Sequence, residues 1–188
     1  MPPKAKKIST AGIIVLVAVL FLLWEHFADG SNKIPSSSSI KVEDAQILSY
    51  FSPYGGCTDA IVNNIYNAEK TIDIAIYTFT SRPISQALVK AYERGVDVRV
   101  IMDRNQAAER FSKKRYIVKK GIPVELHTGD GIMHNKFAVF DSSIVITGSF
   151  NWTSSAERYN YENIVVINSP ELARRYEAEF DKMWKKFE

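Results

Sequence analysis

Three regions of the chain differ in how hydrophobic and polar positions are arranged. From Ile8 to Trp24 no residue is charged and almost all are apolar, without the polar face that a surface helix shows. Residues 29–41 are mostly polar and contain four consecutive serines, which is typical of a flexible tether. Beyond residue 41, runs with a period of two alternate with segments whose apolar residues recur at helical spacing. We therefore predict an N-terminal hydrophobic helix within residues 1–28, a linker over 29–41 and one folded domain over 42–188.

The domain pattern predicts an α/β fold. Helices are expected at 58–70, 82–94, 104–120 and 170–187. Strands are expected at 71–79, 96–102, 123–127, 136–140, 143–147 and 162–167, and a further short apolar segment covers 45–51. The strands at 136–140 and 143–147 flank Asp141-Ser142 and predict a hairpin. Strand–helix–strand units of this spacing imply a mixed β-sheet sandwiched between helices.

The N-terminal segment has the layout of a targeting sequence. Lys4, Lys6 and Lys7 precede the apolar run, as in an export signal or a signal anchor. Ala28-Asp29-Gly30 offers a small-x-small pattern for signal peptidase, so a cleaved signal peptide and an uncleaved membrane anchor both remain open. In either case the lysines stay cytoplasmic, and the domain is expected to be periplasmic or on the extracytoplasmic face of the membrane.

Composition excludes only a few classes of partner and site. The chain carries 24 Lys and Arg against 21 Asp and Glu, and the excess lies mainly in the N-terminal segment, so net charge does not by itself indicate a nucleic-acid partner. The single cysteine, Cys57, excludes an intrachain disulfide framework and a cysteine-rich zinc site. It is expected to be a small buried hydrophobe.

Candidate chemistry is concentrated between residues 134 and 162. His134 and Lys136 share one face of an extended chain. There, a neutral imidazole can attack phosphorus while the ammonium neutralises a phosphate oxygen. Ser149 and Asn151 follow the same alternation and supply neutral donors to the same phosphate. Glu162 opens the next strand, where its carboxylate can accept the second imidazole N–H of His134.

These residues together resemble the signature of the phospholipase D superfamily. The quoted pattern is His134-x-Lys136-x4-Asp141 followed by Gly148-Ser149-x-Asn151. The single motif, the exported start and the later Glu162 are similar to the family's small bacterial endonuclease branch. Asp141 belongs to the motif and is a candidate catalytic residue on that ground. However, it lies beyond a strand whose residues each advance about 3.3 Å, which favours a turn-stabilising role over direct catalysis.

The resemblance implies a two-step displacement. His134 forms a phosphohistidine while a second histidine protonates the leaving oxygen, and water then attacks with that histidine as base. Because this chain carries one motif, the second histidine is expected to be His134 of a partner in a C2 homodimer with a shared active site. No cofactor and no metal are expected, because no carboxylate or histidine cluster at ligand spacing lies near the motif.

The sequence leaves the substrate class open. Six basic residues lie between 110 and 120 and form a possible phosphate track, in which Lys113 and Lys114 are candidate substrate-binding residues; a solvated helix face explains them equally well. The resemblance favours a non-specific endonuclease acting on DNA or RNA. A membrane tether instead favours a phospholipase D or cardiolipin-type hydrolase acting on membrane phospholipids. A non-catalytic module that binds anionic polymer or membrane is the third alternative.

Overall fold

The computed structural model describes residues 45–188, and the expected hydrophobic helix and linker lie outside them. The helices are α2 (Cys57–Asn67), α3 (Arg82–Glu93), α4 (Arg104–Ala108), α5 (Lys114–Lys119), α6 (Ser154–Arg158) and α7 (Pro170–Phe187). The strands are β1 (Gln46–Phe51), β2 (Thr71–Ile76), β3 (Asp97–Met102), β4 (Val124–Leu126), β5 (Lys136–Phe140), β6 (Ile144–Gly148) and β7 (Asn163–Asn168). Among these residues, no helix has both the length and the apolar character needed to cross a membrane.

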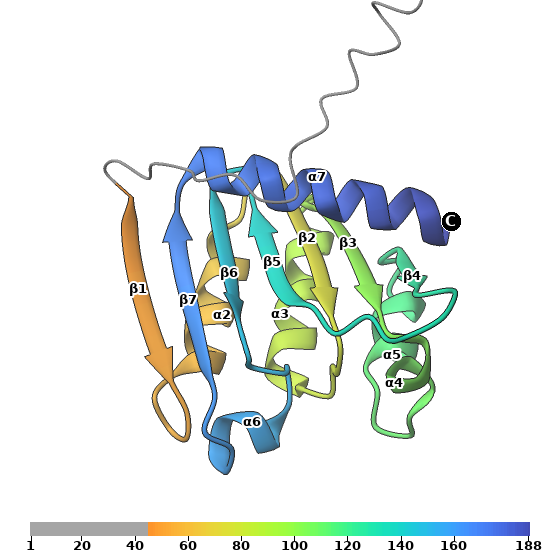
Figure 1. The fold of residues 1–188 in the computed structure, drawn as a ribbon, viewed down its shortest axis with the longest axis horizontal. Helices are drawn as coiled ribbons and strands as arrows, with labels where there is room; N and C mark the ends of the chain where they lie inside the picture. Colours follow the sequence, from red (N-terminus) through yellow and green to blue (C-terminus); the bar gives the residue numbers. More distant parts are fainter. Residues whose placement is uncertain (1–44) are drawn as a thin grey trace, which may run out of the picture. The chain divides into compact units, whose positions relative to one another are not determined.

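The strands form one mixed seven-stranded sheet in the order β1-β7-β6-β5-β2-β3-β4 (Figure 1). β2, β3 and β4 are parallel to one another, whereas β5 pairs antiparallel with both β2 and β6. β7 lies antiparallel between β6 and β1. The predicted mixed sheet and the hairpin between β5 and β6 are therefore confirmed.

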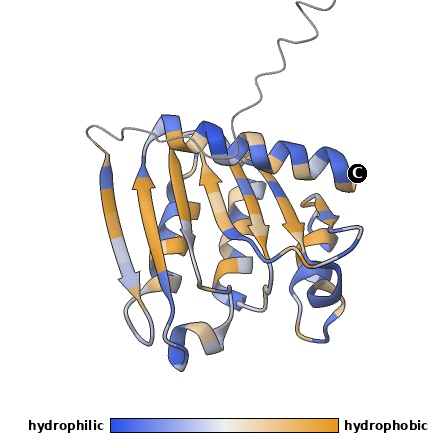
Figure 2. Cartoon of the chain, in the orientation of Figure 1, coloured by the Kyte–Doolittle hydropathy of each residue, from blue (hydrophilic) through white to orange (hydrophobic). Residues whose placement is uncertain are grey.

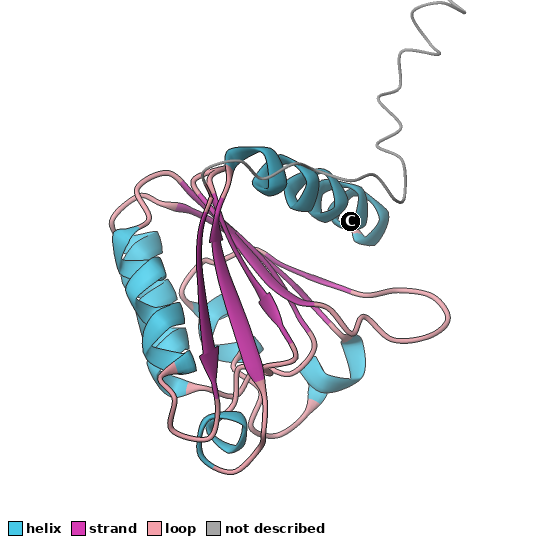
Figure 3. Cartoon of the chain, turned by 60° about the vertical axis from the view of Figure 1, so that its left-hand side comes forward, coloured by secondary structure: helices cyan, strands magenta, loops and turns pink. Residues whose placement is uncertain are grey.

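Helices cover both faces of the sheet (Figure 3). The amphipathic helices α2 and α3 pack on one face over a core that includes Ile74, Val100 and Ile146. On the other face α7 packs over Ala75, Val139 and other β-sheet residues through its buried residues Ala173, Phe180 and Phe187. Apolar positions run along the strands, and most of the outer surface of α7 is hydrophilic (Figure 2). The predicted sandwich of a sheet between helices is correct for the described residues.

An ion network centred on Arg99 links α7 to the sheet. The guanidinium of Arg99 on β3 donates two hydrogen bonds to the carboxylate of Asp73 on β2, at 2.8 and 2.9 Å. It also pairs with Asp181 of α7 at 2.9 Å and lies 4.9 Å above the ring of Phe180. The bidentate pair holds the Arg99 guanidinium in one geometry, and from there it contacts Asp181 and Phe180 of α7.

Several local predictions differ from the structure. The helix expected over 58–70 ends at Asn67, and the strand expected over 71–79 ends at Ile76. The helix expected over 104–120 is two short helices, α4 and α5, because the backbone N–H of Lys113 bonds to the carbonyl of Phe79 at 2.9 Å instead of continuing a helix. The short helix α6 was not expected. It begins at Thr153, whose hydroxyl accepts from Ala156 N, and its Glu157 carboxylate accepts from the N–H groups of Gly56 and Thr58 at the start of α2.

Cys57 behaves as expected. It is fully buried in the core beneath α2, and burial raises the pKa of its thiol to about 11. A thiol of this kind stays protonated at neutral pH and is a poor nucleophile.

Candidate active site

The strand directions bring the predicted site residues to one edge of the sheet. The carboxyl ends of β2 and β6 lie beside the amino ends of β5 and β7, because these neighbours are antiparallel. This is the lower edge in Figure 1. Segments that are up to 85 residues apart, starting at residues 77, 134, 149 and 162, therefore meet there. The sequence predicted His134, Ser149 and Glu162 as site residues, but it did not predict the strand pairing that brings them together.

His134, Lys136 and Tyr77 form the centre of this edge. The Lys136 ammonium donates to the carbonyl of His134 at 2.8 Å and lies 5.0 Å above the ring of Tyr77. The His134 ring meets the Tyr77 ring edge-on, with centroids 4.5 Å apart. The imidazole is exposed, whereas Lys136 is partly buried. The expected adjacency of imidazole and ammonium is therefore present in the structure.

The backbone around His134 is fixed on both sides. The N–H of Tyr77 donates to the carbonyl of Asn135 at 3.0 Å. On the other side, the N–H of Met133 donates to the carboxylate of Asp103, a buried side chain that also caps α4. Because these anchors come from the ends of β2 and β3, the sheet itself determines where the exposed imidazole stands.

Lys136 lies in a mixed electrostatic environment. Burial lowers the pKa of its ammonium below the ordinary lysine value, and the negative charge of Glu162 partly opposes that effect. The Glu162 carboxylate accepts a hydrogen bond from the side chain of Asn160 at 3.2 Å. Within the described chain it forms no hydrogen bond to His134, so the expected orienting contact is not made inside one copy.

Ser149 and Gly148 shape the strand end beside Lys136. The hydroxyl of Ser149 accepts from the N–H of Asn163 at 3.2 Å, and the N–H of Ser149 donates to the carbonyl of Asn163 at 3.1 Å. A Cβ at Gly148 would come within 2.2 Å of that carbonyl oxygen. The absence of a side chain at Gly148 therefore lets this strand end lie close to β7.

Asn151 is oriented by the segment that follows β2. Its side-chain carbonyl accepts from the N–H of Thr78 at 3.4 Å, which leaves the amide N–H₂ free to donate. The Thr78 hydroxyl in turn donates to Gln106 of α4 at 2.9 Å. Trp152, the next residue along the chain, is buried against Phe79, with ring centroids 5.3 Å apart. This packing holds the Asn151 loop against the end of β2.

Asp141 lies at the opposite end of β5 from His134. Its carboxylate accepts three backbone N–H groups, from Glu69, Lys70 and Thr71, at 2.7–2.9 Å. Burial alone would raise the pKa of Asp141, but these donors outweigh it and lower the pKa below the ordinary value. The structure therefore does not bring Asp141 to the candidate site. Its contacts match the turn-stabilising role expected from strand length, and its inclusion among the candidate catalytic residues is corrected.

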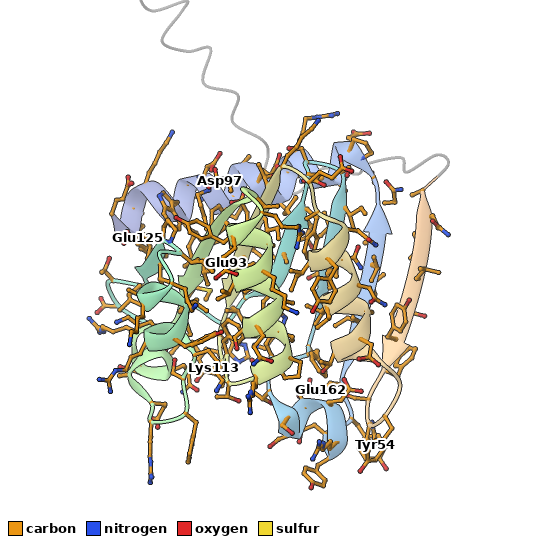
Figure 4. All side chains as sticks on the ribbon, turned by 180° about the vertical axis from the view of Figure 1, so that it is seen from behind. Tyr54, Glu93, Asp97, Lys113, Glu125 and Glu162 are labelled. Atoms are coloured by element: carbon orange, nitrogen blue, oxygen red, sulfur yellow. The ribbon has the colours of Figure 1, made fainter. Side chains whose placement is uncertain are left out.

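The basic cluster lies next to the same edge. Lys113 N bonds to the carbonyl of Phe79, just beyond the carboxyl end of β2, and Lys114 begins α5. Both side chains are partly exposed. Figure 4 shows Lys113 and Glu162 toward the same end of the domain.

Three residues at this edge, Tyr77, Thr78 and Asp103, were not assigned to the site from the sequence. All three lie at or just beyond the carboxyl end of a strand, which is the available signal. Among residues 45–188, no group of three or more His, Cys, Asp or Glu side chains is arranged to hold a metal ion.

Known proteins resemble this chain over most of its length. The family model for the cardiolipin synthase, PLD-like domain matches residues 61–184. "Phospholipase D" of Rickettsia conorii is 33% identical over 189 residues, covering 94% of each protein. "Mitochondrial cardiolipin hydrolase" of Chlamydomonas reinhardtii is 36% identical over 121 residues, covering 64% of this chain and 54% of that protein.

Solved structures agree with this result. Nuc from Salmonella typhimurium, a phospholipase D family member, superposes with a TM-score of 0.72 at 35% identity, covering 76% of this chain and 95% of Nuc. NucT from Helicobacter pylori gives the same TM-score at 27% identity, covering 76% of this chain and 97% of NucT. The residues matched by the family model include His134, Lys136 and Asn151. The chain therefore belongs to the phospholipase D superfamily.

Proposed function

We propose that the domain is a metal-independent phosphodiesterase that cleaves P–O bonds through a covalent phosphohistidine at His134. Membership of the superfamily makes it a phosphoric diester hydrolase; the mechanism and the substrate are the proposed part. The observation that carries the proposal is the His134–Lys136 pair, with the exposed imidazole beside an ammonium fixed 2.8 Å from the His134 carbonyl.

The reaction runs in two displacements. A nitrogen of neutral His134 attacks phosphorus, the P–O bond to the leaving group breaks, and a second, protonated histidine gives its proton to the leaving oxygen. Water then attacks the phosphohistidine. The second histidine takes the proton from that water, the P–N bond breaks, and a phosphomonoester leaves. His134 and the second histidine end as they began.

The remaining polar groups bind the phosphate. Lys136 neutralises the charge that builds up on the phosphoryl oxygens. Ser149 and the free amide of Asn151 donate to the same oxygens, and the carbonyl of Asn151 is already engaged by Thr78 N. Glu162 supports the ammonium form of Lys136 through its charge. Asn151 and Lys136 thus hold the substrate while His134 reacts.

The second histidine is proposed to come from a partner copy. Helix α7 packs chiefly on β2, β4, β5 and β6, and the β1–β7 half of that face carries Ile47 and Phe51 with 57% and 63% of their surface exposed. Their cross-strand partners on this face are Ile167 and Asn163. Large exposed apolar side chains near one another are typical of a protein interface, and a C2 pair presents the same surface twice.

Mixed dimers test this arrangement. Wild-type full-length chain is mixed with excess inactive His134→Ala. Its activity should fall below the level expected from dilution alone, because each dimer of one wild-type and one variant copy lacks one of its two histidines. Phe51→Glu should give a monomer by sedimentation and lose turnover, whereas Tyr66→Glu, an exposed aromatic on α2, should change neither property. A fully active monomer would refute the shared site.

Nucleic acid is the proposed substrate. The Lys113–Lys114 cluster beside the site edge supplies cations for neighbouring phosphates. Lys113→Glu with Lys114→Glu should weaken DNA binding and reduce the salt slope by roughly 0.7–0.9 per lost phosphate contact. Cleavage of a small chromogenic diester should barely change. Equal losses on both substrates would show that the cluster supports the fold instead.

Phospholipid is the second candidate. A specific observation favours it: the Rickettsia relative that matches 94% of this chain is called phospholipase D. An exported domain with residues 1–28 as anchor would work next to headgroups, at high local concentration. If lipid is the substrate, deleting residues 1–28 should reduce turnover of anionic vesicles more than the Lys113/Lys114 charge reversal does.

One parallel assay tests the proposal as a whole. The full-length chain in mild detergent is offered plasmid DNA, RNA, anionic phospholipid vesicles and the chromogenic diester, each with and without EDTA. We expect turnover that EDTA leaves unchanged. Loss on chelation with recovery on adding a divalent ion would overturn metal independence. Absence of turnover on every substrate would favour a module that only binds anionic polymer or membrane.

A further inference from the structure

Tyr77 stands at the centre of the site but has no part in the chemistry described so far. It is the first residue beyond β2, and its side chain is partly buried. Its ring and the His134 imidazole pack edge-to-face with centroids 4.5 Å apart, and the Lys136 Nζ lies over the ring, 5.0 Å from its centroid. One side chain therefore contacts both residues that the proposed mechanism uses first.

The contacts of the Tyr77 ring with Lys136 and with His134 have different physical effects. An aromatic ring has a negative face and a positive edge. A cation above the face is stabilised by this charge distribution, and the edge-on packing against imidazole restricts how the His134 ring turns. The backbone supports both contacts, because the Tyr77 N–H is bonded to the Asn135 carbonyl between His134 and Lys136.

The ammonium of Lys136 needs such stabilisation. Burial disfavours its charged form, and its described partners are few: the His134 carbonyl, the more distant charge of Glu162 and the Tyr77 ring. No carboxylate lies within 4 Å of it in the described chain. The ring face is thus positioned to stabilise the charged form of Lys136 against the effect of burial.

We propose that Tyr77 is a positioning residue for the reaction: its ring face stabilises the Lys136 ammonium, and its packing against the imidazole sets the orientation of the nucleophilic His134. This rests on the proposed function of the same two residues. The aromatic ring is the required feature, and the hydroxyl is not. Tyr77 acts through Lys136 and His134 and does not touch the phosphate.

The test compares the pH–rate profile of the full-length chain on the chromogenic diester with those of Tyr77→Leu and Tyr77→Phe. Tyr77→Leu should lower kcat/KM by about three- to thirtyfold, the range expected for a lost cation–π contact, and move the alkaline limb to lower pH. Tyr77→Phe keeps the aromatic ring and should therefore have the kcat/KM and the alkaline limb of the wild-type chain. The matched control is Tyr66→Leu, which removes another lysine–tyrosine contact, 5.8 Å from Lys90 Nζ to the ring centroid, and should leave the profile unchanged.

A graded series keeps the result independent of folding defects. Phenylalanines with increasing fluorine content at position 77 preserve ring shape but weaken the charge on the ring face, so the alkaline limb should move stepwise to lower pH. Titration of the Lys136 side-chain NMR signal, assigned by its loss in Lys136→Met, should show the same order without any substrate. An unchanged Lys136 titration across the series would overturn the proposal. Absence of turnover in the wild-type chain would instead count against the proposed function.

Discussion

The two ends of strand β5 carry the two ends of one sequence motif but differ in every physical respect. At the amino end, His134 is exposed and Lys136 has an ammonium that burial makes less stable. At the carboxyl end, Asp141 accepts three backbone N–H groups, and its charged form is favoured. Incomplete pairing leaves groups free for a ligand, whereas complete pairing stabilises a turn. A motif that is continuous in sequence thus combines the proposed reactive part with a structural part.

The largest expected effect is at the amino end. His134→Ala should reduce turnover by at least about a thousandfold, as removal of a nucleophile does in other enzymes. Because the imidazole is exposed, its loss should leave the free energy of unfolding within about 0.5 kcal/mol of wild type. Initial rates and urea unfolding curves measure both quantities. Retained turnover would show that the reactive group lies elsewhere.

The carboxyl end should show the reverse pattern. Asp141→Ala should lower the free energy of unfolding by about 2 kcal/mol, because the three N–H groups of residues 69–71 lose a charged acceptor. Turnover at low temperature should fall much less than in His134→Ala. Asp141→Asn, which keeps one acceptor oxygen and tolerates the positive φ of 50° found there, should be intermediate. A catalytic defect without lost stability would contradict the structural role.

The pH dependence of the free energy of unfolding provides a second test of the role of Asp141. Because the folded-state pKa of Asp141 is lowered, its stabilisation is fully present above the ordinary carboxyl pKa of about 3.9. It is lost as pH falls through the folded-state value. The difference in unfolding free energy between wild type and Asp141→Asn should therefore be constant near neutral pH and shrink below about pH 4. A difference that grows on acidification would contradict the assignment.

The smallest effect is expected for Glu162→Gln. The carboxylate charge raises the pKa of Lys136 against the effect of burial, so its removal should move the alkaline limb of the rate to lower pH. At neutral pH the rate should fall by only about two- to tenfold, because the two groups interact through partly screened charge. Glu125→Gln, on edge strand β4, is the matched control and should leave the limb in place.

Sequence patterns predicted the strands better than their partners. Residues 136–140 and 170–187 match β5 and α7 to the residue, because a short apolar run bounded by a turn and the Ser169-Pro170 start of the helix are strong local signals. The break at residues 109–113 was missed because the Lys113–Phe79 bond that causes it joins distant segments. The contact of Tyr77 with His134 was inaccessible for the same reason. Local sequence patterns predict the individual strands and helices and the side chains that they carry. Which of those side chains lie in contact depends on the order of the strands in the sheet.

The covalent step at His134 is the central claim, and the stereochemistry at phosphorus tests it most directly. A chiral phosphorothioate diester is hydrolysed in ¹⁸O-labelled water by the full-length chain, and the configuration of the product is determined. Two successive in-line displacements, first by His134 and then by water, each invert phosphorus, so the account requires overall retention. Overall inversion would mean that water attacks the diester directly and that no phosphohistidine forms.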